Sequence, residues 1–287
     1  MKPPAFAYFR PESVAEALAL LGSHGADAKV LAGGQSLIPL LNLRLATPAA
    51  LVDINRLAEL AYVRVADGQV VIGALARHAD VLADTAAAAA QPLIGQALRL
   101  VAHPVIRNRG TTVGSIVHAD PAGEMTAVLA VLGGSVKVAS VAGQRLVPAV
   151  SFFLGPLEPD VGPDELAIEA IFPVLPARTG CGFAEVSRRH GDYAICGVAA
   201  TVTLDEIGQV SLARAAYLSV SGTPLVLDLT KACAGAGIAD AGEFAVTRID
   251  PSSDIHATAA YRRHLAGVLT ARALTDALAH ARENAVV

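Results

Sequence analysis

Tryptophan is absent from this 287-residue sequence, and aromatic residues make up only 4% of it. Cysteine is also scarce: only Cys181, Cys196 and Cys233 occur, and no two of them have C-x-x-C spacing. Such a set cannot supply the four thiolates of an ordinary iron-sulfur cluster or zinc ribbon. Any cluster of that kind must belong to another chain, and we expect these three cysteines to be free and structural.

Charged residues are few as well, at 17%, and 22 Lys+Arg against 26 Asp+Glu give a net charge of -4. A negative chain repels a phosphate backbone, so nucleic acid is not an expected partner. No uncharged run reaches the ~18 residues that a membrane helix needs. The first residues also lack the apolar stretch of a secretory signal. The sequence therefore predicts no membrane span and a cytoplasmic location.

Apolar residues account for 53% of the chain, which excludes disorder for most of its length. Its length predicts roughly two domains of ~100–200 residues each. The chain has 25 glycines and 16 prolines beside very few aromatic residues. This composition predicts small side chains and many turns.

The first ~55 residues have the pattern of a small β-α-β unit. Ser13-Val-Ala-Glu16 has the spacing of a capping box, and it predicts an amphipathic helix that ends at Gly22 or Gly25. Residues 29–32, which run into Gly33, and residues 50–54, just before Asn55, are predicted to be short buried strands that follow it.

Residues 62–172 predict a second lobe that mixes strands and helices. Asp67-Gly68 separates two β-rich runs, at 62–65 and 69–74, and this arrangement is typical of a hairpin. Proline and glycine positions then delimit helices at about 78–84, 94–102 and 121–132, and strands at 136–138 and 166–172. The alternation in the last strand predicts that Glu169 faces outward.

Residues 173–180 contain two prolines and a glycine between two β-rich regions, which is typical of a linker between domains. Beyond it, runs at 183–186, 197–204 and 210–220 predict an antiparallel meander of three strands. Helices are predicted at about 225–233, 240–245 and 256–283, with Gly267 dividing the last. These elements together predict an α+β domain after the linker.

Two glycines, Gly33 and Gly34, directly follow a predicted strand and precede Gln35 and Ser36. Glycines at such a turn let backbone N–H groups face a phosphate, and the side-chain amide and hydroxyl add further donors. The segment suits a pyrophosphate, although it is neither the dinucleotide fingerprint G-x-G-x-x-G nor a Walker A sequence. The alternative is a tight turn that binds nothing.

A second glycine-rich segment, residues 108–115, leads into a stretch that holds His118, Asp120 and Glu124. Its glycines and hydroxyls are suited to a polar ligand. Asp120 stands just before a predicted helix, so the alternative role for its carboxylate is helix capping. His118-x-Asp120 lacks a nearby third ligand, and we therefore expect no metal site.

Residues 187–194 place two arginines, a histidine and an acid beside Tyr193. This combination suits contact with an anionic cofactor or a partner chain, and the alternative is a solvated charged turn. Elsewhere, no Ser-His-Asp order or paired-carboxylate spacing stands out, which argues against a hydrolase.

Taken together, these segments resemble one family, the FAD-binding medium subunits of molybdenum hydroxylases, a group that includes carbon monoxide, xanthine, nicotine and caffeine dehydrogenases. The resemblance runs nearly from end to end, and it rests on the order and spacing of motifs that are each weak alone. These motifs are Phe6-Ala-Tyr-Phe-Arg-Pro11, Ala32-Gly-Gly-Gln-Ser36, Leu51-Val-Asp-Ile54, Val71-Ile-Gly-Ala74, Arg109-Gly-Thr111, Asp120-Pro121 and Gly191-Asp-Tyr193.

The resemblance implies an α+β fold: a two-lobed FAD-binding domain of the vanillyl-alcohol-oxidase-like (PCMH) type, then a C-terminal α+β domain with a three-stranded antiparallel sheet and helices. The first lobe would cover residues 1–57, the second lobe 58–175 and the C-terminal domain 178–287. In this family the flavin lies between the two N-terminal lobes, and the C-terminal domain closes over it.

The resemblance also implies roles for individual residues. The FAD pyrophosphate would be wrapped by Ala32, Gly33, Gly34, Gln35 and Ser36, with a second loop formed by Thr111, Gly114 and Ser115. The adenosine and ribose would lie along Val101 and Asp120 or Glu124, and the isoalloxazine ring near Leu166. Ser187 stands where some relatives carry a lysine near the flavin. Tyr193 would be the catalytic residue: it would lie near the isoalloxazine ring and control how the electron acceptor approaches it.

One position departs from the family's usual second loop, Thr-Ile-Gly-Gly, because this chain has Val113 where a glycine is common. If that position needs a positive φ, valine is strained there. The local backbone path and the contacts of the second loop would then differ from those of the family.

The implied function is that of the FAD-carrying electron-transfer subunit of a heterotrimeric molybdenum hydroxylase. Electrons would come from the molybdenum cofactor of a large subunit, through two 2Fe-2S clusters of a small iron-sulfur subunit, and leave FAD for an external acceptor. The overall reaction would hydroxylate an N-heterocycle or a related small molecule. Two alternatives stay open: a self-sufficient FAD-dependent reductase of the same fold, and an interaction subunit without flavin.

Overall fold

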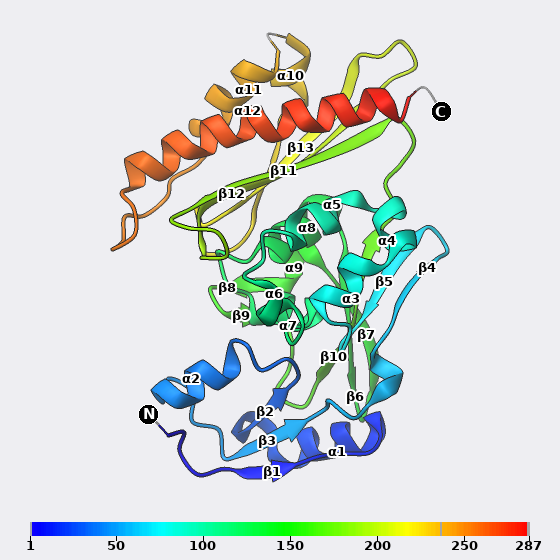
Figure 1. The fold of residues 1–287 in the computed structure, drawn as a ribbon, viewed down its shortest axis with the longest axis vertical. Coiled ribbons are helices and arrows are strands. Elements are labelled where there is room, and N and C mark those ends of the chain that lie inside the picture. The colour runs from blue at the N-terminus through cyan, green and yellow to red at the C-terminus, as the bar shows by residue number, and fades with distance from the viewer. Residues whose placement is uncertain (1, 236, 286–287) are drawn as a thin grey trace.

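The computed structural model describes residues 2–235 and 237–285, which form three parts stacked along the long axis of the molecule (Figure 1). The first part has three parallel strands in the order β1-β3-β2. Its elements are β1 (Ala7–Phe9), α1 (Val14–His24), β2 (Ala28–Leu31), α2 (Leu37–Leu43) and β3 (Ala50–Asp53). The predicted helix and both predicted strands are confirmed as α1, β2 and β3, whereas β1, which precedes α1, and α2, which connects β2 to β3, were not predicted.

Helix α1 begins and ends through local chemistry. The Ser13 hydroxyl accepts the N–H of Glu16 at 3.1 Å, and the Glu16 carboxylate accepts the N–H of Glu12 at 2.8 Å. Gly25 follows the helix with a φ of 52°, which glycine adopts without strain. The helix therefore ends at the second of the two predicted glycines, not at Gly22.

The second part contains an antiparallel sheet in the order β4-β5-β10-β6-β7. Its strands are β4 (Val63–Ala66), β5 (Gln69–Gly73), β6 (Ser135–Ser140), β7 (Gly143–Pro148) and β10 (Leu166–Pro173). Beside it are α3 (His78–Ala83), α4 (Thr85–Ala90), α5 (Pro92–Leu98), α6 (Pro104–Arg107), α7 (Thr112–His118), α8 (Glu124–Leu132), α9 (Ala149–Phe152) and the hairpin of β8 (Phe153–Gly155) and β9 (Glu158–Pro159). The predicted hairpin between β4 and β5 is confirmed, since Asp67 and Gly68 both have positive φ.

Helix α8 begins later than predicted. Its first residue is Glu124, whereas the prediction placed Pro121 in the first turn. The Asp120 carboxylate accepts the N–H of Ala122 at 2.8 Å, so these residues form a separate turn before the helix.

Glu169 on β10 is buried, and the prediction that it faces outward is wrong. Tyr62 and Arg64 contact its Oε1, and Lys137 contacts its Oε2. Lys137 comes from the adjacent strand β6 and Arg64 from β4, two strands away, and these cations compensate the cost of burying a carboxylate. Such cross-strand partners are not visible in the alternation of one strand.

The third part is built on four antiparallel strands, β11 (Thr179–Ser187), β12 (Ala194–Leu204), β13 (Val210–Leu218) and β14 (Leu225–Asp228). The predicted meander is confirmed as β11, β12 and β13. Residues 225–228 are a fourth strand and not the start of a helix, because the open edge of β13 provides backbone partners for them. The helices are α10 (Thr230–Gly235), α11 (Ile238–Val246) and α12 (Ala259–Glu283).

Gly267 does not divide α12, which is continuous for 25 residues. A Cβ on Gly242 of α11 would lie 2.5 Å from the carbonyl oxygen of Gly267, and a Cβ on Gly267 would lie 2.9 Å from Val246. These glycines let two helices pack backbone against backbone. The predicted break is therefore a position of close helix contact.

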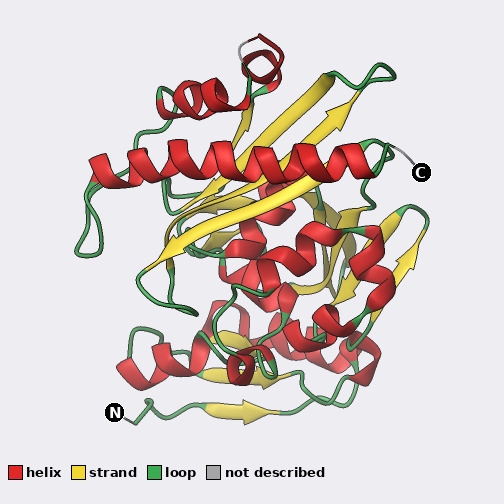
Figure 2. Ribbon diagram, turned by 45° about the horizontal axis from the view of Figure 1, so that its top comes forward, coloured by secondary structure: helices red, strands yellow, loops and turns green. Residues whose placement is uncertain are grey.

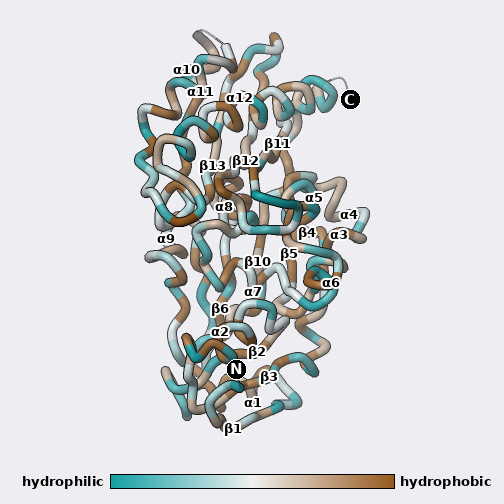
Figure 3. Tube along the Cα trace, turned by 60° about the vertical axis from the view of Figure 1, so that its left-hand side comes forward, coloured by the Kyte–Doolittle hydropathy of each residue, from teal (hydrophilic) through white to brown (hydrophobic). Residues whose placement is uncertain are grey.

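Helices cover the C-terminal sheet, and α12 lies across its strands (Figure 2). Helix α12 contacts β11 and β12, while α5 and α8 of the second part contact the same sheet. The buried residues of α12 recur at helical spacing, and polar and apolar residues alternate along it in Figure 3. A Cβ on Gly180 would lie 2.0 Å from the carbonyl oxygen of Ala277, which explains why this sheet is rich in small residues.

Each large sheet lies within one of the ranges 1–57, 58–175 and 178–287, and we keep these ranges as the proposed division of the chain. All three cysteines are free and buried, as expected. Among residues 2–235 and 237–285, no helix combines the length and apolar character that crossing a membrane requires.

Candidate functional site

A cleft of about 670 Å³ lies where the three parts meet. Its walls come from β2 and the loop after it, from the α6–α8 region and residues 157–167 of the second part, and from residues 191–193 between β11 and β12. Its volume is within the range of small-molecule sites. Every site residue that the resemblance implied lines this cleft except Ser187.

The first glycine-rich segment is the loop between β2 and α2. Gly34 has a φ of 72°. The N–H groups of Gly34, Gln35 and Ser36 have no hydrogen-bond acceptor within the described residues. The Gln35 side chain donates to the carbonyl of Gly33 at 3.1 Å, so it shapes the loop. Successive free N–H groups beside a positive-φ glycine are a backbone arrangement that binds anions.

The two glycine-rich segments touch each other. A Cβ on Gly33 would lie 2.5 Å from the carbonyl oxygen of Arg109 and 2.8 Å from the Cα of Gly110. A Cβ on Gly110 would in turn lie 3.0 Å from the buried ring of His78. Glycine at these positions permits a backbone contact between lobes, and it brings both predicted segments into one site.

Asn55 and Arg77, which the sequence analysis did not single out, hold this contact in place. Asn55 donates from Nδ2 to the carbonyl of Ala32 at 2.8 Å, and its Oδ1 accepts Arg77 Nη2 at 2.7 Å. Arg77 Nη1 donates to the carbonyl of Arg109 at 2.7 Å. A signal was available for Asn55: it follows β3 as Gly33 follows β2, and ligands bind beyond the carboxyl ends of parallel strands.

The second segment enters helix α7 through Thr111, whose hydroxyl accepts the N–H of Gly114 at 3.1 Å. A Cβ on Gly114 would lie 2.5 Å from that hydroxyl oxygen, so glycine suits this cap. Ser115 is half-buried in the same turn. Val113 lies in the first turn of α7, without a positive φ, and is 2% exposed. The strain considered at Val113 does not occur, because the residue has a helical φ, which valine adopts freely, and its side chain packs in the core.

Two acids near the start of α8 line the cleft. The Asp120 carboxylate accepts a backbone N–H in the turn before α8. This contact resembles the capping role considered above, but it precedes the first residue of the helix. Glu124 is 9% exposed. Burial, together with the neighbouring Glu185 and Asp120, raises the pKa of Glu124 to about 8. At neutral pH, Glu124 is therefore a neutral acid that can donate a hydrogen bond.

The other predicted residues lie on the walls and rim. Val101 and Leu166 are buried wall residues. Tyr193 is 65% exposed at the rim. Ser187 lies outside the lining, and its hydroxyl donates to the carbonyl of Arg189 at 2.9 Å. Its expected place near the cofactor does not agree with this position, because the hydroxyl is used within its own turn.

Within the described ranges, no three His, Cys, Asp or Glu side chains are grouped as metal ligands. His118 Nε2 and Asp120 Oδ2 lie 4.0 Å apart without a third ligand beside them.

The residues present fit FAD. Free N–H groups at residues 34–36 suit the oxygens of a pyrophosphate, and buried apolar walls suit a flat aromatic ring. Asp120 and the protonated Glu124 add polar contacts of the kind that hydroxyl-bearing ligands require.

The comparisons with known proteins agree with this reading of the cleft. A family model described as FAD binding domain in molybdopterin dehydrogenase matches residues 4–175, and one described as CO dehydrogenase flavoprotein C-terminal domain matches residues 182–277. The 6-hydroxypseudooxynicotine dehydrogenase complex subunit alpha of Paenarthrobacter nicotinovorans is 42% identical, over 98% of this chain and 97% of the relative. Caffeine dehydrogenase subunit beta of Pseudomonas sp. (strain CBB1) is 38% identical, over 96% of each.

A solved structure of carbon monoxide dehydrogenase from Hydrogenophaga pseudoflava contains a chain with a TM-score of 0.91 and 36% identity. The match covers 98% of this chain and 99% of that chain. The fold and the matches thus define a flavoprotein with an FAD-binding domain and a flavoprotein C-terminal domain. The chain belongs to the FAD-binding medium subunits of molybdenum hydroxylases, and it is a subunit of an oxidoreductase. The predicted family and fold class are confirmed.

The protonated state of Glu124 gives a test on the FAD-free protein. The folded chain keeps the proton up to about pH 8, whereas the unfolded chain releases it near 4.5. Wild-type stability therefore falls as pH rises between these values, and Glu124→Gln removes this loss. We expect the variant to gain on the order of 3 kcal/mol over wild type between pH 5 and pH 9, measured by urea unfolding.

Glu59→Gln, at an exposed position, is the matched control and should follow the wild type at each pH. A Glu124→Gln advantage that stays constant across this pH range would show that Glu124 titrates normally.

Proposed function

We propose that this chain is the electron-transfer subunit of a heterotrimeric molybdenum hydroxylase. It receives electrons from two 2Fe-2S clusters of a small subunit, which draws them from the molybdenum cofactor of a large subunit, and it delivers them to an external acceptor. The observation that carries the proposal is the contact of two glycine-rich loops from separate lobes at one cleft. When bound, FAD supplies a carrier that takes up and releases electrons singly or in pairs.

Each part of the cleft has a role in this proposal. The N–H groups of residues 34–36 bind the pyrophosphate, and the α7 entrance at Thr111, Gly114 and Ser115 completes that end of the site. Val101, Asp120 and Glu124 lie along the adenosine and ribose. Leu166 forms a wall for the isoalloxazine ring, and Tyr193 covers the side from which the acceptor approaches.

The overall reaction in this proposal is hydroxylation of an N-heterocycle or a related small molecule. Two relatives at 42% and 38% identity are named for 6-hydroxypseudooxynicotine and caffeine, which supports that class of substrate. The pocket that selects the substrate belongs to the large subunit. A cytoplasmic location completes the proposal, and three free cysteines agree with a reducing compartment.

Purification from the native source tests this function. We expect near-stoichiometric FAD in this chain, released by heat and identified by chromatography, together with copurifying chains that carry molybdenum and iron-sulfur absorbance. These chains are expected because no described cysteine set can hold a cluster.

Two results would contradict the proposal. Turnover of a nicotinamide donor by the single chain would favour a self-sufficient reductase. A colourless chain that fails to take up added FAD would favour an interaction subunit.

Tyr193 provides a separate prediction about the acceptor side. Because it is exposed at the rim, Tyr193→Ala should change turnover with a bulky acceptor, such as a cytochrome, relative to turnover with oxygen. We expect a severalfold change in this ratio, measured in the complete complex. Tyr261→Ala removes another exposed tyrosine, from α12, and is the control. An acceptor ratio that is equal in both variants and the wild type would remove Tyr193 from this role.

A further inference from the structure

One wall of the cleft is made by a segment with little secondary structure of its own. Between residues 157 and 165 it holds only the two-residue strand β9, and the next strand, β10, begins at Leu166. Lining residues from this region are Leu157, Pro159, Val161, Gly162, Pro163 and Glu165. Something outside the segment must fix its path, because irregular backbone without anchors is mobile.

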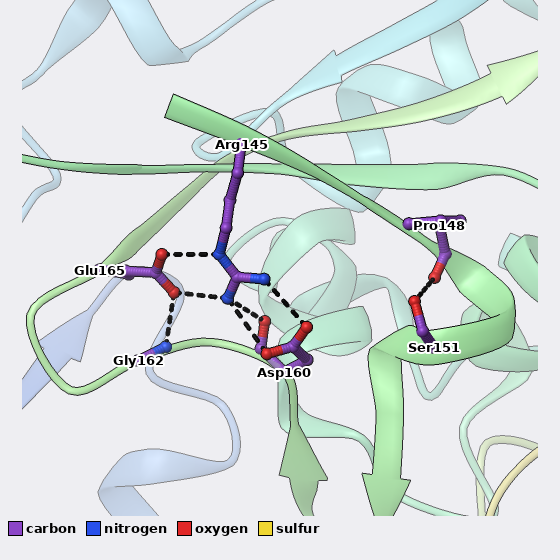
Figure 4. A network of polar contacts seen from close by, with 6 residues as sticks. All are labelled: Arg145, Pro148, Ser151, Asp160, Gly162 and Glu165. Atoms are coloured by element: carbon purple, nitrogen blue, oxygen red, sulfur yellow. Dashed lines mark hydrogen bonds and ion pairs between the residues drawn. The ribbon is translucent and has the colours of Figure 1, made fainter. Parts of the chain in front are cut away.

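Arg145 on β7 supplies that anchor (Figure 4). Its guanidinium binds both carboxylate oxygens of Glu165, from Nε at 2.8 Å and from Nη2 at 2.7 Å. On the other side it binds the Asp160 carboxylate from Nη1 at 2.9 Å and the Asp160 carbonyl from Nη2 at 3.0 Å. Glu165 also accepts the N–H of Gly162 at 2.7 Å. One side chain thus ties residues 160, 162 and 165 together.

This network differs from an ordinary surface ion pair. Isolated exposed pairs contribute little, but a bidentate arginine shared by two carboxylates has fixed geometry. Glu165 is largely buried in it, and the hydrogen bonds from Arg145 lower the pKa of Glu165. Arg145 is not itself among the lining residues of the cleft.

The same wall has a second anchor at its other end. The N–H of Leu157 donates to the carbonyl of Ala119 at 2.9 Å, directly after α7. The segment is therefore fixed at one end to the residue that follows α7 and at the other end to β7. Arg145 controls the end that leads to the proposed ring wall at Leu166.

We propose that Arg145 is a positioning residue for FAD: by binding Asp160 and Glu165 it holds the 157–165 wall in the shape that retains the cofactor. The inference rests on the proposed FAD site. It assigns a role to a residue that lies outside the cleft, on β7, one of the two edge strands of the five-stranded sheet.

The test compares FAD release from the purified protein carrying Arg145→Met, Arg145→Lys or Asp160→Asn. We expect release to be roughly tenfold faster in Arg145→Met, with a changed visible circular dichroism band of the bound flavin. Arg145→Lys should be intermediate, because lysine keeps the charge but not the two-pronged geometry. Asp160→Asn alone should also release FAD faster than the wild type, and the double variant Arg145→Met/Asp160→Asn should differ little from Arg145→Met, since both changes break one network.

Arg64→Met is the matched control. Arg64 lies on β4, the opposite edge strand of the same sheet, and pairs with Glu169 away from the cleft. This variant loses an exposed arginine ion pair, so it should release FAD as the wild type does. Equal release and equal dichroism in Arg145→Met and Arg64→Met would overturn the inference. If Arg145→Met does not fold, wild-type release from both Arg145→Lys and Asp160→Asn would overturn it equally. Failure of the wild type to bind FAD would instead overturn the proposed function.

Discussion

The site depends on one backbone contact, that of Gly33 with Arg109 and Gly110. The first lobe meets the second there with no room for a methyl group, since a Cβ on Gly33 would lie 2.5 Å from a carbonyl oxygen. Asn55 and Arg77 then fix the two backbones through carbonyl groups on either side. The free N–H groups of residues 34–36 lie directly after this contact in the chain. The proposed cofactor site therefore depends on the close approach of the two lobes.

The C-terminal domain contributes few residues to the cleft. Glycine and alanine let α12 lie directly on β11 and β12. Among residues 178–235 and 237–285, those that line the cleft are 191–193. Tyr193 projects at that rim. The proposed function divides the work in the same way: the two lobes supply most of the cleft lining, and the loop with Tyr193 is the proposed control of access to it.

Features that rest on local chemistry were predictable from the sequence. The Ser13 cap, the turn at Asp67-Gly68 and the glycine-rich segments all depend on residues close together in the chain. Features that rest on distant partners were not. Strand β14 forms only because β13 offers an edge, and Gly267 lies in a helix because α11 packs against it. Arg77 and Arg145 act on backbone and carboxylate groups that no local pattern connects to them.

The most direct test of this account is the FAD dissociation constant of Gly33→Ala, measured by flavin fluorescence, beside Gly95→Ala. A Cβ on Gly95 of α5 meets nothing closer than 3.9 Å, so that variant should bind FAD as the wild type does. Gly33→Ala should separate the two loops and weaken binding at least ~100-fold while the apo-protein keeps its helical circular dichroism. Wild-type affinity in a folded Gly33→Ala variant would contradict the claim that the contact between the lobes builds the cofactor site.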